Sequence, residues 1–355
     1  MKILHLSAEC YPAAKAGGLA DVVGSLPKYV NQIGHKCEVV IPKYDNDWIG
    51  RQNYETVYES SFKMKREEVQ FSVDKMENDK LGFPLYVVDI PGRFHRPGIY
   101  IDPWSGHGYW DELERFVSFQ IVVMEWVKDH KERPDIIHCH DHHTGLVPFM
   151  ISQCNRYREM SEIPTVMTVH NAEYHGEHDI DNYKLLPAFN IDNIGLLDWN
   201  GRLNSLATGL KCAWKITTVS KSYMNELAEN SNGLELLFQQ ERAKSQGILN
   251  GIDTEVWDPA ADDLVTFNFS YKNRKQGKEK NKKELCKQFG LNPELPTISF
   301  IGRLVREKGA DLLPDLFKKM LSSDAEINFI LLGTGDQQLH EIFANMISNH
   351  MGYFD

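Results

Sequence analysis

The chain has 355 residues, of which 42% are hydrophobic and 25% charged, and its formal net charge at pH 7 is −11. Proteins that bind nucleic acid or anionic membranes usually carry net positive charge, so this composition argues against both kinds of partner. No apolar run is long enough to span a bilayer and residues 1–7 lack the apolar region of a signal peptide, so we expect a cytoplasmic protein.

The first ninety residues predict a βαβ unit followed by a β-hairpin. Short apolar runs at 3–7 and 37–41 flank a segment of helical period at 19–33, and Gly34 stands where a helix C-cap belongs. From residue 55 to residue 90 the pattern changes to alternating strands with turn residues. We expect this hairpin at the edge of the sheet.

The rest of the chain predicts a return to alternating helices and strands, which is typical of parallel sheets. The expected helices are 111–130, 310–321 and one that begins near Asp336, and the expected strands are 135–140, 165–169, 216–219, 247–250, 297–301 and 327–332. The chain is too long for one ordinary core. We therefore predict two α/β lobes, 1–245 and 246–355, joined through the polar stretch 239–246.

Polar residues follow the predicted strands at the points where the strands end. They are Glu9, Lys15, His138, His140, Asp141, His170, Asn171 and Ser220 in the first lobe, and Arg303, Lys308 and residues 333–336 in the second. Ligands of open parallel sheets bind at the carboxyl ends of the strands. Both lobes are therefore expected to present polar groups to one crevice.

The segment 15–21, Lys-Ala-Gly-Gly-Leu-Ala-Asp, is a candidate phosphate-binding loop. Gly17 and Gly18 would let backbone N–H groups approach a phosphate at the start of a helix, and Lys15 adds a full positive charge. A glycine pair before a helix also occurs in ordinary turns, and the segment is not a Walker loop.

The segment 9–22 resembles the donor-phosphate signature of the glycogen and starch synthases, with Ala16 where the family often has threonine or valine. The same resemblance continues in order through Arg-Pro-Gly-Ile-Tyr at 96–100, His-Cys-His-Asp-His-His-Thr-Gly-Leu at 138–146, Thr-Val-His-Asn at 168–171, Thr-Thr-Val-Ser at 217–220, Ile-Leu-Asn-Gly-Ile-Asp-Thr-Glu-Val-Trp at 248–257, Gly-Arg-Leu at 302–304 and Lys-Gly at 308–309. The resemblance thus spans the whole chain.

This resemblance implies the glycosyltransferase B fold, with two Rossmann-like lobes whose parallel sheets face a cleft. It implies transfer of glucose from ADP-glucose or UDP-glucose to the non-reducing end of an α-1,4-glucan such as glycogen, with retention of configuration. The implied donor-binding residues are Lys15, Gly17, Gly18, Asp21, Arg303 and Lys308. The implied acceptor-binding residues are Asp141, His170 and Asn171, and the implied catalytic residues are His170, Lys15, Arg303 and Lys308.

The transfer builds negative charge on the departing diphosphate, which fixed cations and backbone amides can stabilise. We therefore expect no metal and no other cofactor. Four histidines at 138–143 invite a metal hypothesis, but neither a second ligand cluster nor a carboxylate-rich partner accompanies them in the sequence. His142 stands where the family commonly has tryptophan, which puts acceptor stacking at this position in doubt.

Alternatives remain open. Taken alone, Arg303 and Lys308 could be an exposed pair at a helix start. The basic stretch 272–287 is interpreted as a solvated helix face or an interlobe segment. The chain ends before the acidic E-x7-E region and the glycine-rich donor loop of the family, so we expect an incomplete second lobe. An inactive glucan-binding fragment and another nucleotide-sugar transferase, such as sucrose synthase, are the competing hypotheses.

Overall fold

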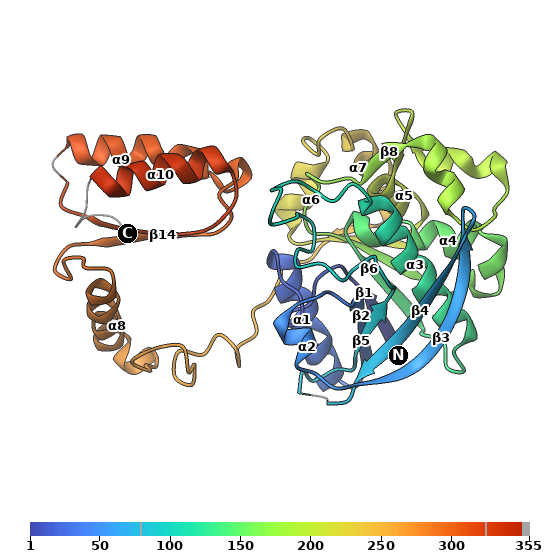
Figure 1. Cartoon of the computed structure of the whole chain (residues 1–355), viewed down its shortest axis with the longest axis horizontal. Coiled ribbons are helices and arrows are strands. Elements are labelled where there is room, and N and C mark those ends of the chain that lie inside the picture. Colours follow the sequence, from blue (N-terminus) through green and yellow to red (C-terminus); the bar gives the residue numbers. More distant parts are fainter. Residues whose placement is uncertain (79, 324, 350–355) are drawn as a thin grey trace. The chain divides into compact units, whose positions relative to one another are not determined.

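The computed structural model describes residues 1–78, 80–323 and 325–349. The chain divides into two compact units, Met1–Ile252 and Asp253–Asp355. In Figure 1 the first runs from blue to yellow and the second from orange to red. Both units combine helices with parallel strands, as the sequence predicts.

Unit 1 is built on a nine-stranded sheet in the order β12-β11-β7-β6-β1-β2-β5-β4-β3. Its strands are β1 (Lys2–Leu6), β2 (Lys36–Pro42), β3 (Tyr54–Met64), β4 (Glu67–Met76), β5 (Leu85–Asp89), β6 (Ile136–His140), β7 (Thr165–Val169), β11 (Lys215–Thr218) and β12 (Ser245–Gly247). Strands β12 through β5 pair in parallel, whereas β4 and β3 add antiparallel at one edge. The predicted edge hairpin is therefore confirmed.

The strand order reverses between β1 and β6, because β1 pairs with β2 on one side and with β6 on the other. In an open parallel sheet such a reversal opens a crevice at the carboxyl ends of the two strands, where loops diverge to opposite faces. The segments that follow β1 and β6 begin at Ser7 and Asp141. The topology thus places both near the expected ligand crevice.

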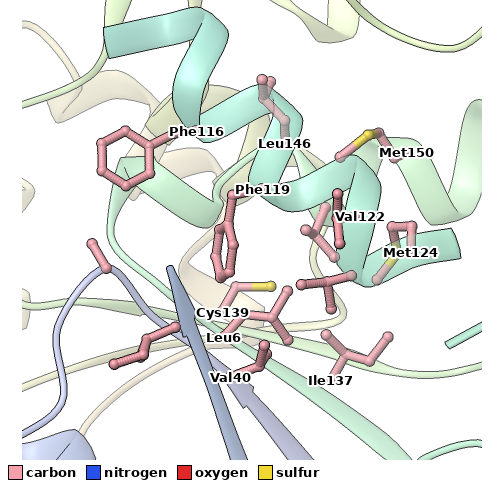
Figure 2. Packing of buried hydrophobic residues seen from close by; sticks show 14 of the residues in the cluster. Leu6, Val40, Phe116, Phe119, Val122, Met124, Ile137, Cys139, Leu146 and Met150 are labelled. Atoms are coloured by element: carbon pink, nitrogen blue, oxygen red, sulfur yellow. The ribbon is translucent and has the colours of Figure 1, made fainter. Parts of the chain in front are cut away.

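The helices of unit 1 are α1 (Gly18–Gln32), α2 (Asp47–Gly50), α3 (Glu112–Asp129), α4 (Val147–Gln153), α5 (Ser205–Cys212), α6 (Lys221–Leu227) and α7 (Glu235–Gln240). Figure 2 shows the core where α3 crosses the sheet. Phe119 and Val122 of α3 pack there over Leu6 of β1 and Cys139 of β6, and all four side chains are buried. This core holds the central strands, and therefore their carboxyl ends, in place.

A small antiparallel sheet lies outside the main one. It is formed by β8 (Glu177–Asp179), β9 (Asp198–Trp199) and β10 (Arg202–Asn204), with β10 in the middle. Asn204 ends β10 and caps α5, since its side-chain oxygen accepts a hydrogen bond from Ala207 N at 2.8 Å.

The predicted boundary after residue 245 differs from the observed one after Ile252. The segment predicted as the first strand of the second lobe, 247–250, belongs instead to unit 1, and only Gly247 of this segment lies in a strand. Gly247 closes β12, which pairs with β11, and Ile248 N donates to Thr218 O at 2.8 Å. The charged stretch before it forms the end of α7 and a 3₁₀ turn. The change to a charged composition therefore comes before the end of unit 1.

Unit 2 contains a two-stranded parallel sheet, β13 (Thr297–Ile301) and β14 (Asn328–Leu332), with helices α8 (Arg274–Gln288), α9 (Leu313–Ser322) and α10 (Gln337–Asn349). Its small core gathers around Phe317, Phe329 and Phe343. The basic stretch forms α8, which buries only Gly277 and Cys286 among its residues. This confirms its interpretation as a solvated helix face.

Within the described residues, no helix combines the length and apolar character that crossing a bilayer requires. All six cysteines are free thiols, five of them buried and Cys212 half-buried.

Gly145 lies at a close approach between the segment after β6 and α5. A Cβ built on Gly145 would lie 2.3 Å from Ser205 O, although the backbone angles, φ −67° and ψ −16°, suit any residue. Overpacking of this kind typically costs about 1–3 kcal/mol. We therefore predict that Gly145→Ala lowers the free energy of unfolding by about that amount in urea titrations.

The matched control is Gly50→Ala in α2, where a built Cβ meets no atom within 4 Å. It should leave stability unchanged or raise it by up to about 1 kcal/mol. Equal effects of the two substitutions would contradict the steric explanation.

Candidate active site

The structure brings Asp141, His170 and Asn171 together at the carboxyl ends of two neighbouring strands. Asp141 directly follows β6 and His170 directly follows β7, and these strands pair in parallel. Asp141 Oδ1 accepts hydrogen bonds from His170 N at 2.7 Å and from Asn171 N at 3.4 Å. The three residues predicted to contact the acceptor therefore form one cluster.

Asp141 has an unusual backbone and an unusual acidity. Its φ of +54° with ψ of −177° is a conformation that residues other than glycine rarely adopt, and such strain is concentrated at functional sites. Burial raises the pKa of Asp141 to about 7, and nearby Glu9 adds repulsion, while the amides of His170 and Asn171 act in the opposite direction. The carboxyl group therefore gains and loses its proton near neutral pH.

Glu9 organises the predicted phosphate-binding loop. Its carboxylate is buried, and Oε2 accepts from Ala16 N at 2.6 Å and from Gly17 N at 2.8 Å. Its other oxygen, Oε1, accepts from the hydroxyl of Tyr100 at 2.7 Å. Glu9 thus joins this loop to the segment that contains Tyr100, a contact that the sequence analysis missed because 91 residues separate the partners.

This contact changes the expectation for the two glycine amides. The N–H of Gly17 is already bonded to Glu9, whereas Gly18 N has no acceptor among the residues that the structure describes. A Cβ built on either glycine meets no atom within 4 Å. The loop surface is therefore open, but of the two predicted phosphate-binding amides only that of Gly18 is unoccupied.

Lys15 and Asp21, both predicted to bind the donor, form an ion pair. Lys15 Nζ lies 2.7 Å from Asp21 Oδ1, and both side chains are about two-fifths exposed, at 41% and 42%. The ammonium group also lies 5.2 Å from the centre of the Tyr11 ring. An exposed pair of this kind is held weakly, so an anion of higher charge can compete for Lys15.

Three further imidazoles, those of His5, His138 and His140, lie close to one another and to the ring of His170. His138 and His140 lie on the same face of β6, as strand alternation predicts, with ring centroids 4.3 Å apart. His5, at the paired position on β1, was missed as a partner because the strand order cannot be read from local patterns. Burial lowers the pKa of His138 to about 4 and that of His170 to about 3, so these rings are neutral at pH 7.

The histidine-rich segment has a carboxylate neighbour that the sequence analysis did not expect. The carboxylate of Glu112 lies beside His142 and His143, with Oε1 3.6 and 3.7 Å from the two Nε2 atoms. Glutamate and histidine are donors that transition metals accept. The two imidazole rings are tilted by 35° to each other, with centroids 3.7 Å apart.

A second group of possible metal donors consists of His5, His138 and His140, whose nitrogens lie within 4.8 Å of one another. Both nitrogens of His140 already take part in hydrogen bonds to other imidazoles. This group therefore does not fit a metal. The expectation that the protein needs no metal stays a prediction.

In unit 2, Arg303 and Lys308 follow β13 as predicted. The segment containing Arg303 is fixed to the neighbouring loop, since Leu304 N donates to Thr334 O at 2.8 Å and Asp336 N donates to Leu304 O at 2.9 Å. Lys308 closes a 3₁₀ turn and is exposed. The carboxyl ends of β13 and β14 thus bring together the two segments that the sequence analysis selected in this unit.

Comparisons with known proteins agree with this arrangement. Residues 2–240 match the family model described as the starch synthase catalytic domain. A glycogen synthase from Flavobacterium johnsoniae is 46% identical over the whole chain, which covers 74% of that protein, and one from Streptococcus uberis is 36% identical over 97% of the chain and 71% of its own length. The catalytic domain of starch synthase IV from Arabidopsis thaliana, bound to ADP and acarbose, superposes with a TM-score of 0.88 at 27% identity, covering 99% of this chain and 73% of the solved one.

Because the pKa of Asp141 is raised in the folded chain, this residue should make the free energy of unfolding depend on pH. An unfolded aspartate has a pKa of about 3.9, so only the folded chain keeps this proton between that value and about 7. The stabilising contribution of the protonated group is complete below pH 4 and is lost as the pH rises through 7. Asp141→Asn keeps an oxygen for the two amides but carries no charge.

We therefore expect Asp141→Asn to be more stable than the wild type at pH 8, by up to about 4 kcal/mol, with the difference shrinking towards pH 4.5. Urea unfolding of both proteins across this pH range tests the prediction. A difference that does not vary with pH would contradict the burial of an acidic group at this position.

Proposed function

Because the chain belongs to the glycogen and starch synthase family of glycosyltransferases, we propose that it transfers glucose from a nucleotide diphosphate donor to the non-reducing end of an α-1,4-glucan, with retention of configuration. The observation that carries the proposal is the Asp141, His170 and Asn171 cluster at the ends of β6 and β7. These three residues belong to the motifs at 138–146 and 168–171, through which the sequence resembles that family.

In this proposal the glucan lies against Asp141 and Asn171, and His170 holds the reacting sugar. The hydroxyl that attacks the anomeric carbon passes its proton to the departing phosphate, so no protein base is needed. A neutral His170 suits this role, because its low pKa keeps a positive charge away from the anomeric carbon, where positive charge develops.

The leaving diphosphate is stabilised by cations and amides in this proposal. In unit 1 these are Lys15 and the N–H of Gly18, with Lys15 exchanging Asp21 for a phosphate oxygen. In unit 2 they are Arg303 and Lys308. A dianionic diphosphate competes well for Lys15 because the ion pair with Asp21 is exposed and weak. Losing one such contact typically costs on the order of 10²–10³ in rate.

We propose ADP-glucose as the preferred donor over UDP-glucose. The support is the bound ADP of the Arabidopsis starch synthase, whose structure matches 99% of this chain. A glucan-binding protein without transferase activity is the second candidate, because the proposed acceptor residues Asp141, His170 and Asn171 all lie within unit 1.

The first prediction concerns the reaction. The full chain should transfer labelled glucose to glycogen, with ADP-glucose preferred to UDP-glucose, and His170→Ala should lower kcat by on the order of 10² or more while changing donor affinity little. Glycogen binding without turnover of either donor would support the second candidate. An unchanged kcat in His170→Ala would contradict the role of the histidine.

The second prediction concerns metals. If fixed cations carry the leaving group, activity in excess chelator should equal that in magnesium. Initial rates measured with and without EDTA test this. A strict requirement for Mg²⁺ or Mn²⁺ would contradict it and would turn attention to Glu112, His142 and His143, whose ligand atoms lie within 4.8 Å of one another.

A further inference from the structure

Three histidines form a continuous chain of hydrogen bonds that ends at the candidate active site. His5 Nδ1 lies 3.1 Å from His140 Nε2, and His140 Nδ1 lies 3.0 Å from His170 Nε2. His5 is 2% exposed and His140 is completely buried, so water does not interrupt the chain. His5 lies in β1, His140 lies in β6 and His170 directly follows β7, and these three strands are neighbours in the sheet.

A neutral imidazole has one N–H donor and one bare nitrogen that accepts. A neutral ring that is hydrogen-bonded at both nitrogens therefore donates at one of them and accepts at the other. Because His140 uses both of its nitrogens in the chain, the two hydrogen bonds run in the same direction. The tautomer of His170 is thus coupled to the tautomers of His140 and His5.

Burial keeps the chain neutral. It lowers the pKa of His170 to about 3 and holds those of His5 and His140 well below the usual value for histidine. His138 stacks against His140 but stands outside the chain, because its Nε2 faces Thr168 Oγ1 at 2.6 Å. No charged side chain forms a hydrogen bond to any of the three rings within the described residues.

The two ends of the chain indicate its direction. The His5 ring is only 2% exposed, and its Nε2 forms no hydrogen bond within the described residues, so an N–H at this nitrogen would have little access to an acceptor. A donor without an acceptor is less tolerable than a bare nitrogen without a donor. At the other end, His170 is half-buried and its Nδ1 has no partner among the described residues. The favourable arrangement has His5 donating to His140 and His140 donating to His170.

We propose that His140 and His5 are positioning residues that fix His170 as the Nδ1–H tautomer, so that Nδ1 donates a hydrogen bond to a hydroxyl of the reacting sugar. This inference rests on the proposed function, in which His170 contacts that sugar. The Nδ1–H tautomer has no bare nitrogen towards the substrate, so His170 binds the sugar and does not act as a base. The hydrogen bond between its Nε2 and His140 fixes the orientation of the His170 ring, and the hydrogen bond from its backbone N–H to Asp141 fixes its backbone.

The test reads the tautomer directly by NMR of the full chain labelled with ¹⁵N-histidine, using long-range ¹H–¹⁵N correlations between pH 6 and pH 8. His170→Ala identifies the signals of His170. The wild type should show a single Nδ1–H tautomer for this residue. His140→Phe removes the donor and should give a mixture of tautomers or the Nε2–H form.

Matched variants separate positioning from folding. His140→Asn places an amide where Nδ1 of histidine lies and should restore the Nδ1–H form of His170. His138→Gln changes an imidazole in the same stack but outside the chain, and should leave the tautomer of His170 as in the wild type. If His140→Phe does not fold, His5→Phe breaks the chain one link further away and should also yield mixed tautomers of His170.

A wild-type His170 in the Nε2–H form, or a tautomer that is unchanged in folded His140→Phe and His5→Phe, would overturn the inference. The NMR result does not depend on turnover, so it is distinguishable from failure of the proposed transferase activity. Where the chain is active, His140→Phe should lower kcat about ten- to hundredfold with the donor KM within about twofold. His140→Asn should recover most of that loss.

Discussion

The hydrogen bond from His170 N to Asp141 Oδ1, 2.7 Å long, ties together the ends of two parallel strands, and the candidate site depends on it. In this bond the backbone N–H that follows β7 donates to the carboxylate that follows β6. Asp141 makes this bond from a backbone with positive φ and from a buried position. Burial raises its pKa to about 7, although the hydrogen bond itself acts in the opposite direction. The same bond fixes the backbone from which the imidazole of His170 projects, so the position of the histidine follows from this contact.

Charge is distributed differently in the loop at the start of α1 and among the buried histidines. The loop is rich in ionic groups, with Glu9 bonded to its amides and Lys15 paired with Asp21 at the surface. His5, His138 and His140, in contrast, are neutral because burial disfavours their charged forms. In the proposed reaction the anionic donor would meet the surface cation Lys15, while the sugar would meet the neutral ring of His170. This division suits a reaction in which the leaving group carries most of the charge.

Much of the fold could be predicted from the sequence, because strands of a buried parallel sheet are short apolar runs and helices have their own period. Residues 165–169 and 297–301 were predicted with the bounds that β7 and β13 have. The segment 247–250 was assigned to the wrong unit, since a strand's partner depends on tertiary pairing and not on its own pattern. For the same reason the sequence indicated Asp141 and His170 but missed His5 and Glu112, which come from elements far away in the chain and which no local motif marks. Tyr100 lies in the motif at 96–100, but its hydrogen bond to Glu9 could not be predicted.

The central claim is that an α-1,4-glucan binds at the carboxyl ends of β6 and β7, with its reacting sugar beside His170. The most direct measurement is a crystal structure of the full chain soaked with a malto-oligosaccharide. The account predicts a glucose unit within hydrogen-bonding distance of His170 Nδ1, with Asp141 and Asn171 lining the same site. An oligosaccharide bound in an ordered manner elsewhere on the chain, with the ends of β6 and β7 occupied only by water, would contradict it.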